Sequence, residues 1–146
     1  MSELRLERDF KASPERLFRA ISAHGELMQW WGPEGMFIPE GTMDFTKLGP
    51  WYSVMQNAEG QQFKVSGQVT HVDTPKSVGF TFAWHDDQDQ RGIESHVTFT
   101  VESTETKTGA GARLILEHRN FEDNESGASH EDGWVSSLRK LEQHLT

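Results

Sequence analysis

The 146-residue sequence contains no cysteine. That absence excludes a disulfide framework, a cysteine-ligated zinc site and thiol catalysis, and it is typical of proteins in reducing compartments. No apolar run approaches the roughly 20 residues that a membrane-spanning helix needs, and no charged-then-apolar leader opens the chain. We therefore expect a soluble, cytoplasmic protein without membrane insertion.

Basic residues are scarce. Lys and Arg number 14 against 23 Asp and Glu, which gives a formal net charge of -9, and the basic side chains occur singly or in pairs such as Arg139-Lys140. A protein that binds nucleic acid neutralises phosphates with clusters of basic side chains. The composition therefore predicts that nucleic acid is not a partner.

Motifs for metals and cofactors are missing as well. The seven histidines fall in no metal-ligand spacing, and there is no glycine-rich phosphate loop. Residues 86–92 resemble a calcium loop only superficially, because Arg91 would occupy the third ligand position. A Ser-His-Asp triad cannot be read from residue order, since its members meet only in space. We predict no metal, no cofactor and no assignable catalytic residue.

What is present is a change of hydrophobic period along the chain. Residues 4–10 alternate with period two, as in a half-buried strand. Ser13-Pro14 then supplies an N-cap and a proline at the first helical position, and glycines bound a second short helix at about residues 24–31. From residue 36 to residue 118 the alternation predicts strands joined by turns. Residues 129–145 return to helical spacing.

This order predicts an α+β fold in one domain over residues 1–146. Strands with one apolar and one polar face, joined by short connections, form antiparallel sheets. The last helix carries an apolar stripe of Trp134, Leu138, Leu141 and Leu145 that must be buried. We expect a curved antiparallel sheet of about six to seven strands wrapped around this long C-terminal helix, with two short helices after the first strand. A gap between such a sheet and its helix can hold a small apolar ligand.

Six short motifs follow one another along nearly the whole chain. They are Ala12-Ser13-Pro14-Glu15 with Leu17 and Phe18; Trp30-Trp31-Gly32-Pro33; Gly67-Gln68-Val69; Pro75 with Val78, Phe80, Phe82 and Trp84; Leu116-Glu117-His118 with Phe121; and Gly133-Trp134 with Leu138 and Leu141. In this order they resemble the START and Bet v 1-like (SRPBCC) superfamily, in the branch of the activator of heat-shock-protein ATPase homologues. The resemblance implies a helix-grip fold. Because that superfamily includes lipid carriers, hormone and toxin binders, polyketide cyclases and co-chaperone domains, function has to be argued from the cavity.

One position departs from the family pattern. Members commonly carry two glycines followed by an aromatic residue and then a Met, whereas here Pro50 stands between Gly49 and Trp51, with Met55 further on. Proline lacks a backbone donor and has a fixed φ. The sequence leaves open what Pro50 does to the turn or edge geometry.

Aromatic residues are the best candidates for a binding site, with five Trp and nine Phe against one Tyr. Large aromatic and Met side chains form ordinary cores and also line apolar pockets, so both interpretations stay open. Met28, Trp30 and Trp31 are the predicted rim, at the position of the family's second helix. The predicted lining comprises Met28, Trp30, Trp31, Met55, Phe63, Phe82, Trp84, Phe99, His118, Phe121, Trp134 and Leu138.

His118 is the titratable candidate in that set. It shares the strand parity of Leu114 and Leu116, so it points inward, either toward a ligand or into a structural hydrogen bond. The leading hypothesis is a non-catalytic protein that encloses a small hydrophobic or aromatic molecule, lipid-like or polyketide-like. The alternatives are a cyclase or dehydratase that uses His118 or Glu117 as acid or base, and a co-chaperone-like interaction domain with a protein partner or as a homodimer.

Overall fold

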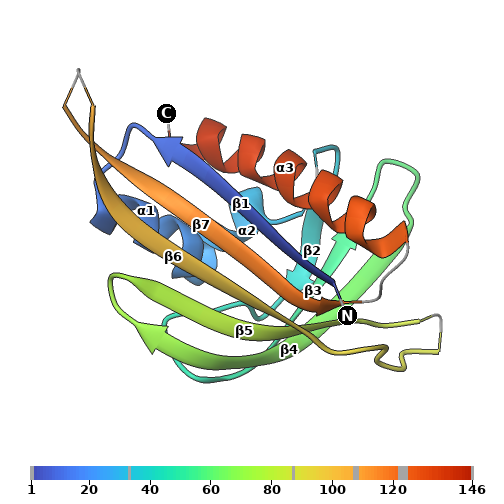
Figure 1. Cartoon of the computed structure of the whole chain (residues 1–146). Helices are drawn as coiled ribbons and strands as arrows, with labels where there is room; N and C mark the ends of the chain where they lie inside the picture. Colours follow the sequence, from blue (N-terminus) through green and yellow to red (C-terminus); the bar gives the residue numbers. More distant parts are fainter. Residues whose placement is uncertain (1, 33, 87, 107–108, 122–124, 146) are drawn as a thin grey trace.

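One curved antiparallel sheet carries the fold in the part of the chain that the computed structural model describes, which is residues 2–32, 34–86, 88–106, 109–121 and 125–145 (Figure 1). Side chains are described for all of these residues except 2, 105–106, 109–110, 120–121 and 125–130. The strands lie in the order β1-β7-β6-β5-β4-β3-β2, and every neighbouring pair is antiparallel. Their bounds are β1 Ser2–Phe10, β2 Phe37–Gly41, β3 Gly49–Gln56, β4 Gln62–Asp73, β5 Ser77–Trp84, β6 Ser95–Thr106 and β7 Gly109–Phe121.

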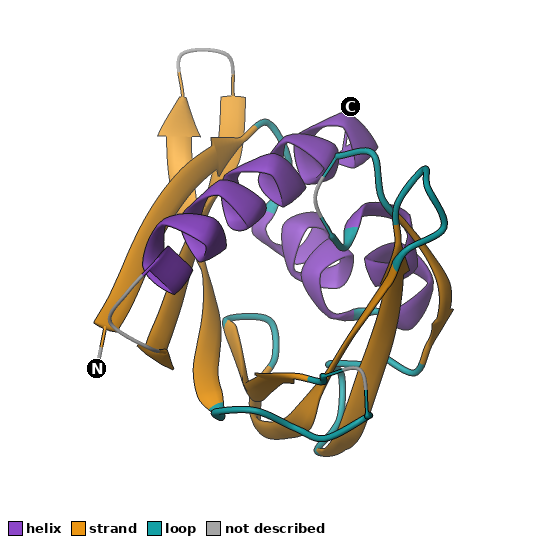
Figure 2. Ribbon diagram, turned by 90° about the vertical axis from the view of Figure 1, so that its right-hand side faces the viewer, coloured by secondary structure: helices purple, strands orange, loops and turns teal. Residues whose placement is uncertain are grey.

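Three helices complete the described chain: α1 Pro14–Ser22, α2 His24–Trp30 and α3 Glu125–Leu145. The sheet curves around α3, and α1 and α2 lie beside α3 (Figure 2). The predicted α+β helix-grip fold, with a curved antiparallel sheet around a long C-terminal helix, is confirmed. Within the described residues, no helix is both long enough and apolar enough to cross a membrane.

The start of α1 follows the predicted cap. Ser13 Oγ accepts the backbone N–H of Arg16 at 3.1 Å, and Pro14 occupies the first helical position, where no intrahelical N–H bond is needed. Leu17 and Ile21, four residues apart, are fully buried. The helix therefore turns its apolar stripe toward the interior.

Alternation along β5 places its apolar side chains on the helix-facing side. Val78 and Phe80 are fully buried and Phe82 is 5% exposed, but Trp84 is 37% exposed. Trp84 lies on the helix-facing side, as the alternation predicts, but unlike the other three it is not buried. Phe63, near the start of β4, is likewise 40% exposed. Both residues keep the inward parity of their strands but lie near strand ends, where neighbouring residues cover them only in part.

The apolar stripe of α3 is buried as the sequence predicts. Trp134, Leu138 and Leu141 are 6%, 3% and 0% exposed. The helix begins at Glu125, one turn before residue 129, where the sequence predicts the return to helical spacing. Ser129 followed by Asp132 resembles a capping box, but a serine followed three residues later by an acid also fits inside a helix at modest cost, so this pattern alone does not mark the start.

Pro50 keeps the register of the sheet. It lies opposite Gln68 of β4. Tyr52, which has the same parity, directs its N–H away from β4 to Thr42 Oγ1 at 3.2 Å, and β2 pairs only with the far end of β3, from Ser53 onward. The N–H that proline lacks would therefore point to the side that β2 leaves uncovered, so no ladder hydrogen bond is lost.

Candidate functional site

Aromatic rings pack together between the concave sheet and α3. The ring centroid of Trp31 lies 5.8 Å from that of Phe45, 5.7 Å from that of Trp51 and 5.6 Å from that of Trp134, all edge-on. Phe80 stacks on Phe45 at 4.3 Å. Such contacts add stability beyond that of the buried area. The aromatic cluster, as it is called below, consists of Trp30, Trp31, Phe45, Trp51, Phe80, Phe82, Phe99 and Trp134, each at most 6% exposed.

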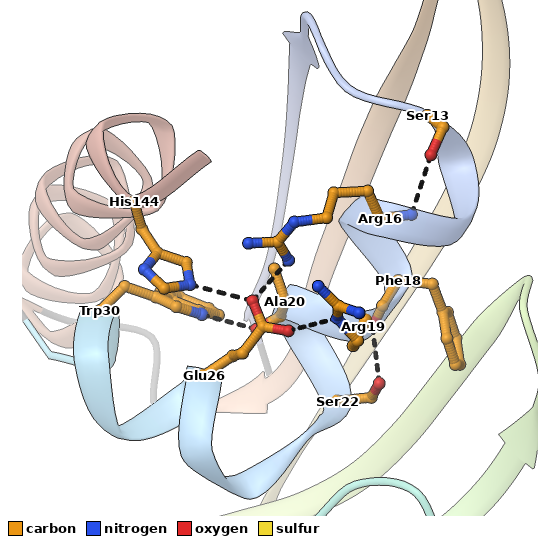
Figure 3. A network of polar contacts seen from close by, with 9 residues as sticks. All are labelled: Ser13, Arg16, Phe18, Arg19, Ala20, Ser22, Glu26, Trp30 and His144. Atoms are coloured by element: carbon orange, nitrogen blue, oxygen red, sulfur yellow. Dashed lines mark hydrogen bonds and ion pairs between the residues drawn. The ribbon is translucent and has the colours of Figure 1, made fainter. Parts of the chain in front are cut away.

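The two tryptophans at the end of α2 belong to this cluster rather than to a rim. Trp30 is fully buried, and its indole N–H donates to the carbonyl oxygen of Ala20 at 2.7 Å (Figure 3). Trp31 is 2% exposed and donates to Ser53 Oγ at 3.1 Å. Buried indoles find a partner for their single donor in this way. The prediction that Trp30 and Trp31 form an entrance is wrong, and of the predicted rim only Met28 is half-buried.

Two members of the aromatic cluster, Phe45 and Trp51, are not among the lining residues predicted from the sequence. Phe45 is fully buried and Trp51 is 2% exposed. Phe45 follows Met43 at a spacing of two residues, and Trp51 shares the strand parity of Met55. All four residues are buried. That alternation is the signal that could have identified them.

His118 lies beside the aromatic cluster, and both of its ring nitrogens are hydrogen-bonded. The Trp134 indole N–H donates to Nδ1 at 3.1 Å, which leaves the ring proton on Nε2. Nε2–H then donates to Ser95 Oγ at 2.6 Å, and the Ser95 hydroxyl donates to the carbonyl oxygen of Phe82 at 3.0 Å. This chain from Trp134 through His118 to Ser95 is called the interior relay below. It gives each of its buried polar side chains a partner, as buried polar groups require.

Glu117 lies on the other side of the sheet. Adjacent residues of a strand point to opposite faces, and His118 is fully buried on the inner one. The Glu117 carboxylate accepts a hydrogen bond from Arg119 Nη2 at 2.7 Å. Glu117 therefore cannot act as an acid or base inside the sheet.

Phe63 and Trp84 are exposed aromatic residues near strand ends, and Trp84 continues the aromatic cluster toward the surface. Phe63 pairs with the buried Met55 of β3. The Trp84 ring lies edge-on to Phe82, with centroids 5.4 Å apart, and Phe82 lies 6.1 Å from Trp134. A continuous row of aromatic rings thus leads from the surface to α3.

The remaining predicted lining residues divide into buried and undescribed ones. Met55, Phe99 and Leu138 are all at most 4% exposed and belong to the same core, whereas the side chain of Phe121 lies outside the described residues. Among the described residues, no group of three or more His, Asp or Glu side chains is arranged to hold a metal ion.

Comparison with known proteins identifies the family. Residues 11–146 match the model of the Activator of Hsp90 ATPase homolog 1-like protein family. The chain belongs to this family. The crystal structure of the AHSA1 protein from Silicibacter pomeroyi is 57% identical, with a TM-score of 0.93, and the match covers 99% of this chain and 97% of that one. Members of the family have ligand-binding or co-chaperone roles.

More distant structures share the fold alone. A protein from Chromobacterium violaceum is 21% identical with a TM-score of 0.80, over 99% of this chain and 98% of that one. A protein from Arthrobacter aurescens is 18% identical with a TM-score of 0.81, over 98% of this chain and 85% of that one. A comparison with curated proteins gives no match.

In this AHSA1-type chain, a lysine holds the connection between α2 and β2 against α3. Lys140 Nζ donates to the backbone carbonyl oxygens of Trp31, Gly32 and Met36 at 3.3, 3.2 and 3.2 Å. Burial lowers the pKa of Lys140, and the nearby Glu34 offsets this only in part. Lys140 therefore ties Trp31, Gly32 and Met36 to α3.

A charged network joins the three helices (Figure 3). Glu26 of α2 accepts hydrogen bonds from Arg16 and Arg19 of α1 at 2.5 and 2.7 Å and from His144 of α3 at 3.0 Å. Burial by itself raises the pKa of Glu26, but the hydrogen bonds from these three residues outweigh it and hold the pKa below its usual value. The network fixes the three helices against one another.

Proposed function

We propose that this protein binds a small hydrophobic or aromatic molecule, lipid-like or polyketide-like, between the concave sheet and α3, and does not transform it chemically. The observation that carries the proposal is the row of rings from the exposed Trp84 through Phe82 to the buried Trp134. Exposed aromatic side chains that continue into an aromatic interior offer an apolar molecule a path of unbroken contact.

Burial of apolar surface supplies the driving force, at about 25 cal/mol per Å². Met55 and the half-buried Met28 and Met36 border the aromatic cluster. Their flexible thioether side chains adjust to ligands of different shape. We propose as the lining the aromatic cluster with these methionines, His118 and Leu138. The absence of cysteine supports placing this activity in the cytoplasm.

A binding role accounts for the interior better than the cyclase or dehydratase alternative does. General acid–base catalysis needs a titratable group that reaches the substrate. Both ring nitrogens of His118 are already hydrogen-bonded, to Trp134 and to Ser95, and Glu117 faces outward. Catalysis in the interior would first have to break the interior relay.

Fluorescent-probe titration tests the proposal. Anilinonaphthalene sulfonate and a long-chain fatty acid serve as probes, with intrinsic tryptophan fluorescence and chemical-shift mapping as readouts. We expect a dissociation constant in the micromolar range, equivalent to about -8 kcal/mol. The variants Phe63→Ala and Trp84→Ala should weaken binding. Phe37→Ala is the matched control, because Phe37 is an aromatic residue of the edge strand β2 that is 53% exposed and is not among the proposed lining residues.

Two results would overturn the proposal. One is the absence of saturable binding by either probe. The other is equal binding by wild type, Phe63→Ala and Trp84→Ala, with shift changes confined to the outer face of the sheet.

The family description supports a second candidate, a co-chaperone-like interaction with a protein. Exposed Phe63, Trp84 and Ile93 would then contact the partner. The test adds this protein to purified Hsp90 and measures ATP hydrolysis. A rise that Trp84→Ala abolishes favours the interaction, and no change in the rate counts against it.

A further inference from the structure

The outer face of the sheet carries a second histidine–serine contact that the binding role does not use. Ser66 lies on β4, and His85 directly follows β5. His85 Nε2 is 2.6 Å from Ser66 Oγ, and His85 Nδ1 is 2.7 Å from Asp89 Oδ1. Nucleophile, base and orienting carboxylate thus have the separations that define a catalytic triad. Ser66, His85 and Asp89 are called the outer triad below.

The partners determine the direction of each hydrogen bond. An ionised Asp89 carboxylate only accepts, so His85 Nδ1–H donates to it and Nε2 keeps its lone pair. The Ser66 hydroxyl therefore donates to Nε2. Arg91 Nε in turn donates to Ser66 Oγ at 3.0 Å, which places a positive charge beside the oxygen that would lose its proton.

The surroundings hold this arrangement in place. The side chain of His85 is only 9% exposed, and its backbone N–H donates to the carbonyl oxygen of Lys64 at 2.9 Å. Asp89 has a φ of 61°, in the left-handed region that few non-glycine residues adopt. Asp86 fixes the turn, because its carbonyl oxygen accepts the Asp89 N–H at 3.0 Å. The turn thereby holds the Asp89 carboxylate against the His85 ring.

We propose that the outer triad hydrolyses small, uncharged, activated esters. Ser66 Oγ attacks the ester carbonyl carbon while His85 Nε2 takes the hydroxyl proton. The bond to the leaving alcohol or phenol then breaks, and His85 returns the proton to the leaving oxygen. Water, activated by His85, cleaves the resulting acyl-serine to give the carboxylic acid and free Ser66. Asp89 stabilises the imidazolium, and Arg91 stabilises the negative charge that develops on Ser66 Oγ as it loses its proton.

The site is open rather than enclosed, which determines the substrate class. Ser66 is half-buried on the outer face of β4, and Asp89 is mostly exposed. Such a site offers little apolar surface for a large acyl group. A good leaving group is needed, because Arg91 also bonds Glu94 at 3.0 Å and its charge is partly neutralised.

The same face supplies a matched control. His71 Nε2 lies 2.6 Å from Ser77 Oγ, the same separation as in the outer triad. In the described part of the chain, no carboxylate is bonded to His71 Nδ1. The His71–Ser77 pair thus has the nucleophile and the base without the orienting group.

Hydrolysis of 4-nitrophenyl acetate tests the proposal, with the wild type compared with Ser66→Ala, His85→Gln, Asp89→Asn and Ser77→Ala. Loss of the base should lower the rate about a hundredfold or more, and Ser66→Ala should fall to the background rate. Ser77→Ala should keep the wild-type rate. Mass spectrometry after a short reaction should find the acetyl group on Ser66, and phenylmethylsulfonyl fluoride should label the same residue. Circular dichroism checks that each variant is folded.

Either of two outcomes would overturn the proposal. In one, Ser66→Ala hydrolyses the ester as fast as the wild type. In the other, the wild type carries the acetyl and sulfonyl groups on lysine or histidine and none on Ser66. Because these readouts concern the outer face only, they do not depend on whether the interior binds a ligand.

Discussion

The interior relay and the outer triad each contain a histidine hydrogen-bonded to a serine, but the donor and the acceptor of that bond are exchanged. In each, Nε2 of the histidine lies 2.6 Å from the serine Oγ. What differs is the group on the far ring nitrogen. The Trp134 N–H donates to His118 Nδ1, whereas the Asp89 carboxylate accepts from His85 Nδ1. The proton of the short hydrogen bond therefore lies on the histidine inside the sheet and on the serine outside it.

Burial explains why the two pairs have different roles. His118 is fully buried and Ser95 is 5% exposed. An unpaired polar atom there would cost about 1–3 kcal/mol, so a closed chain of hydrogen bonds stabilises the fold. Ser66 on the outer face is open to solvent on one side, where a substrate can approach it. Distance alone therefore does not distinguish a structural pair from a reactive one.

Removal of the tryptophan from the interior relay should have the largest effect on the stability of the fold. Trp134→Ala is expected to lower the free energy of unfolding by about 3–5 kcal/mol, because it leaves a cavity in the aromatic cluster and takes the donor from His118. Urea denaturation measures the loss. Trp134→Phe keeps most of the ring and separates the hydrogen bond from the volume. A loss below about 1 kcal/mol for Trp134→Ala would show that the residue is peripheral.

Truncation of the two serines tests the comparison directly. Ser95→Ala should cost about 1–3 kcal/mol, since it removes the hydroxyl that accepts the buried His118 Nε2–H. Ser66→Ala should change stability by less than about 0.5 kcal/mol, because water can replace the hydroxyl at the surface. Urea denaturation of both variants gives the difference. Equal costs would mean that burial does not separate the two pairs.

A third histidine, His144, extends the comparison because it also contacts a carboxylate, that of Glu26. The folded state holds the pKa of Glu26 below its usual 4.5, so the stabilisation is present above pH 4.5 and is lost as the pH falls through the lower folded-state value. Glu26→Gln should therefore lower stability by about 1 kcal/mol at neutral pH and remove this acid-dependent loss. Urea denaturation across the acid range measures it. Parallel pH profiles for the two proteins would contradict the assignment.

The smallest effect on stability is expected for Asp89→Asn. Asparagine also tolerates a left-handed φ, and exposed ion pairs contribute little to stability. The thermal midpoint should stay at the wild-type value while ester hydrolysis falls. Differential scanning calorimetry provides the check. A clearly lowered midpoint would make the role of Asp89 structural.

The architecture could be predicted from the sequence because its signals are local. Ser13 caps α1 through a hydrogen bond to a residue three positions away. Val78 and Phe80 of β5 are buried as the alternation predicts, and so is Leu138 of α3. Periodicity assigns each side chain to a face. Periodicity does not predict how much of that face other residues cover. For this reason the exposure of Trp84 could not be predicted.

The sequence by itself determined the succession of strands and helices, the apolar face of each, and the family. Only the tertiary structure decided the polar chemistry. Ser95 and Trp134 meet His118 across 23 and 16 residues of sequence, and Ser66 meets His85 across 19. Such contacts depend on strand register and on the side chain at the far ring nitrogen. Neither leaves a local pattern, because hydrogen-bond direction is set by atoms that come together only when the sheet has formed.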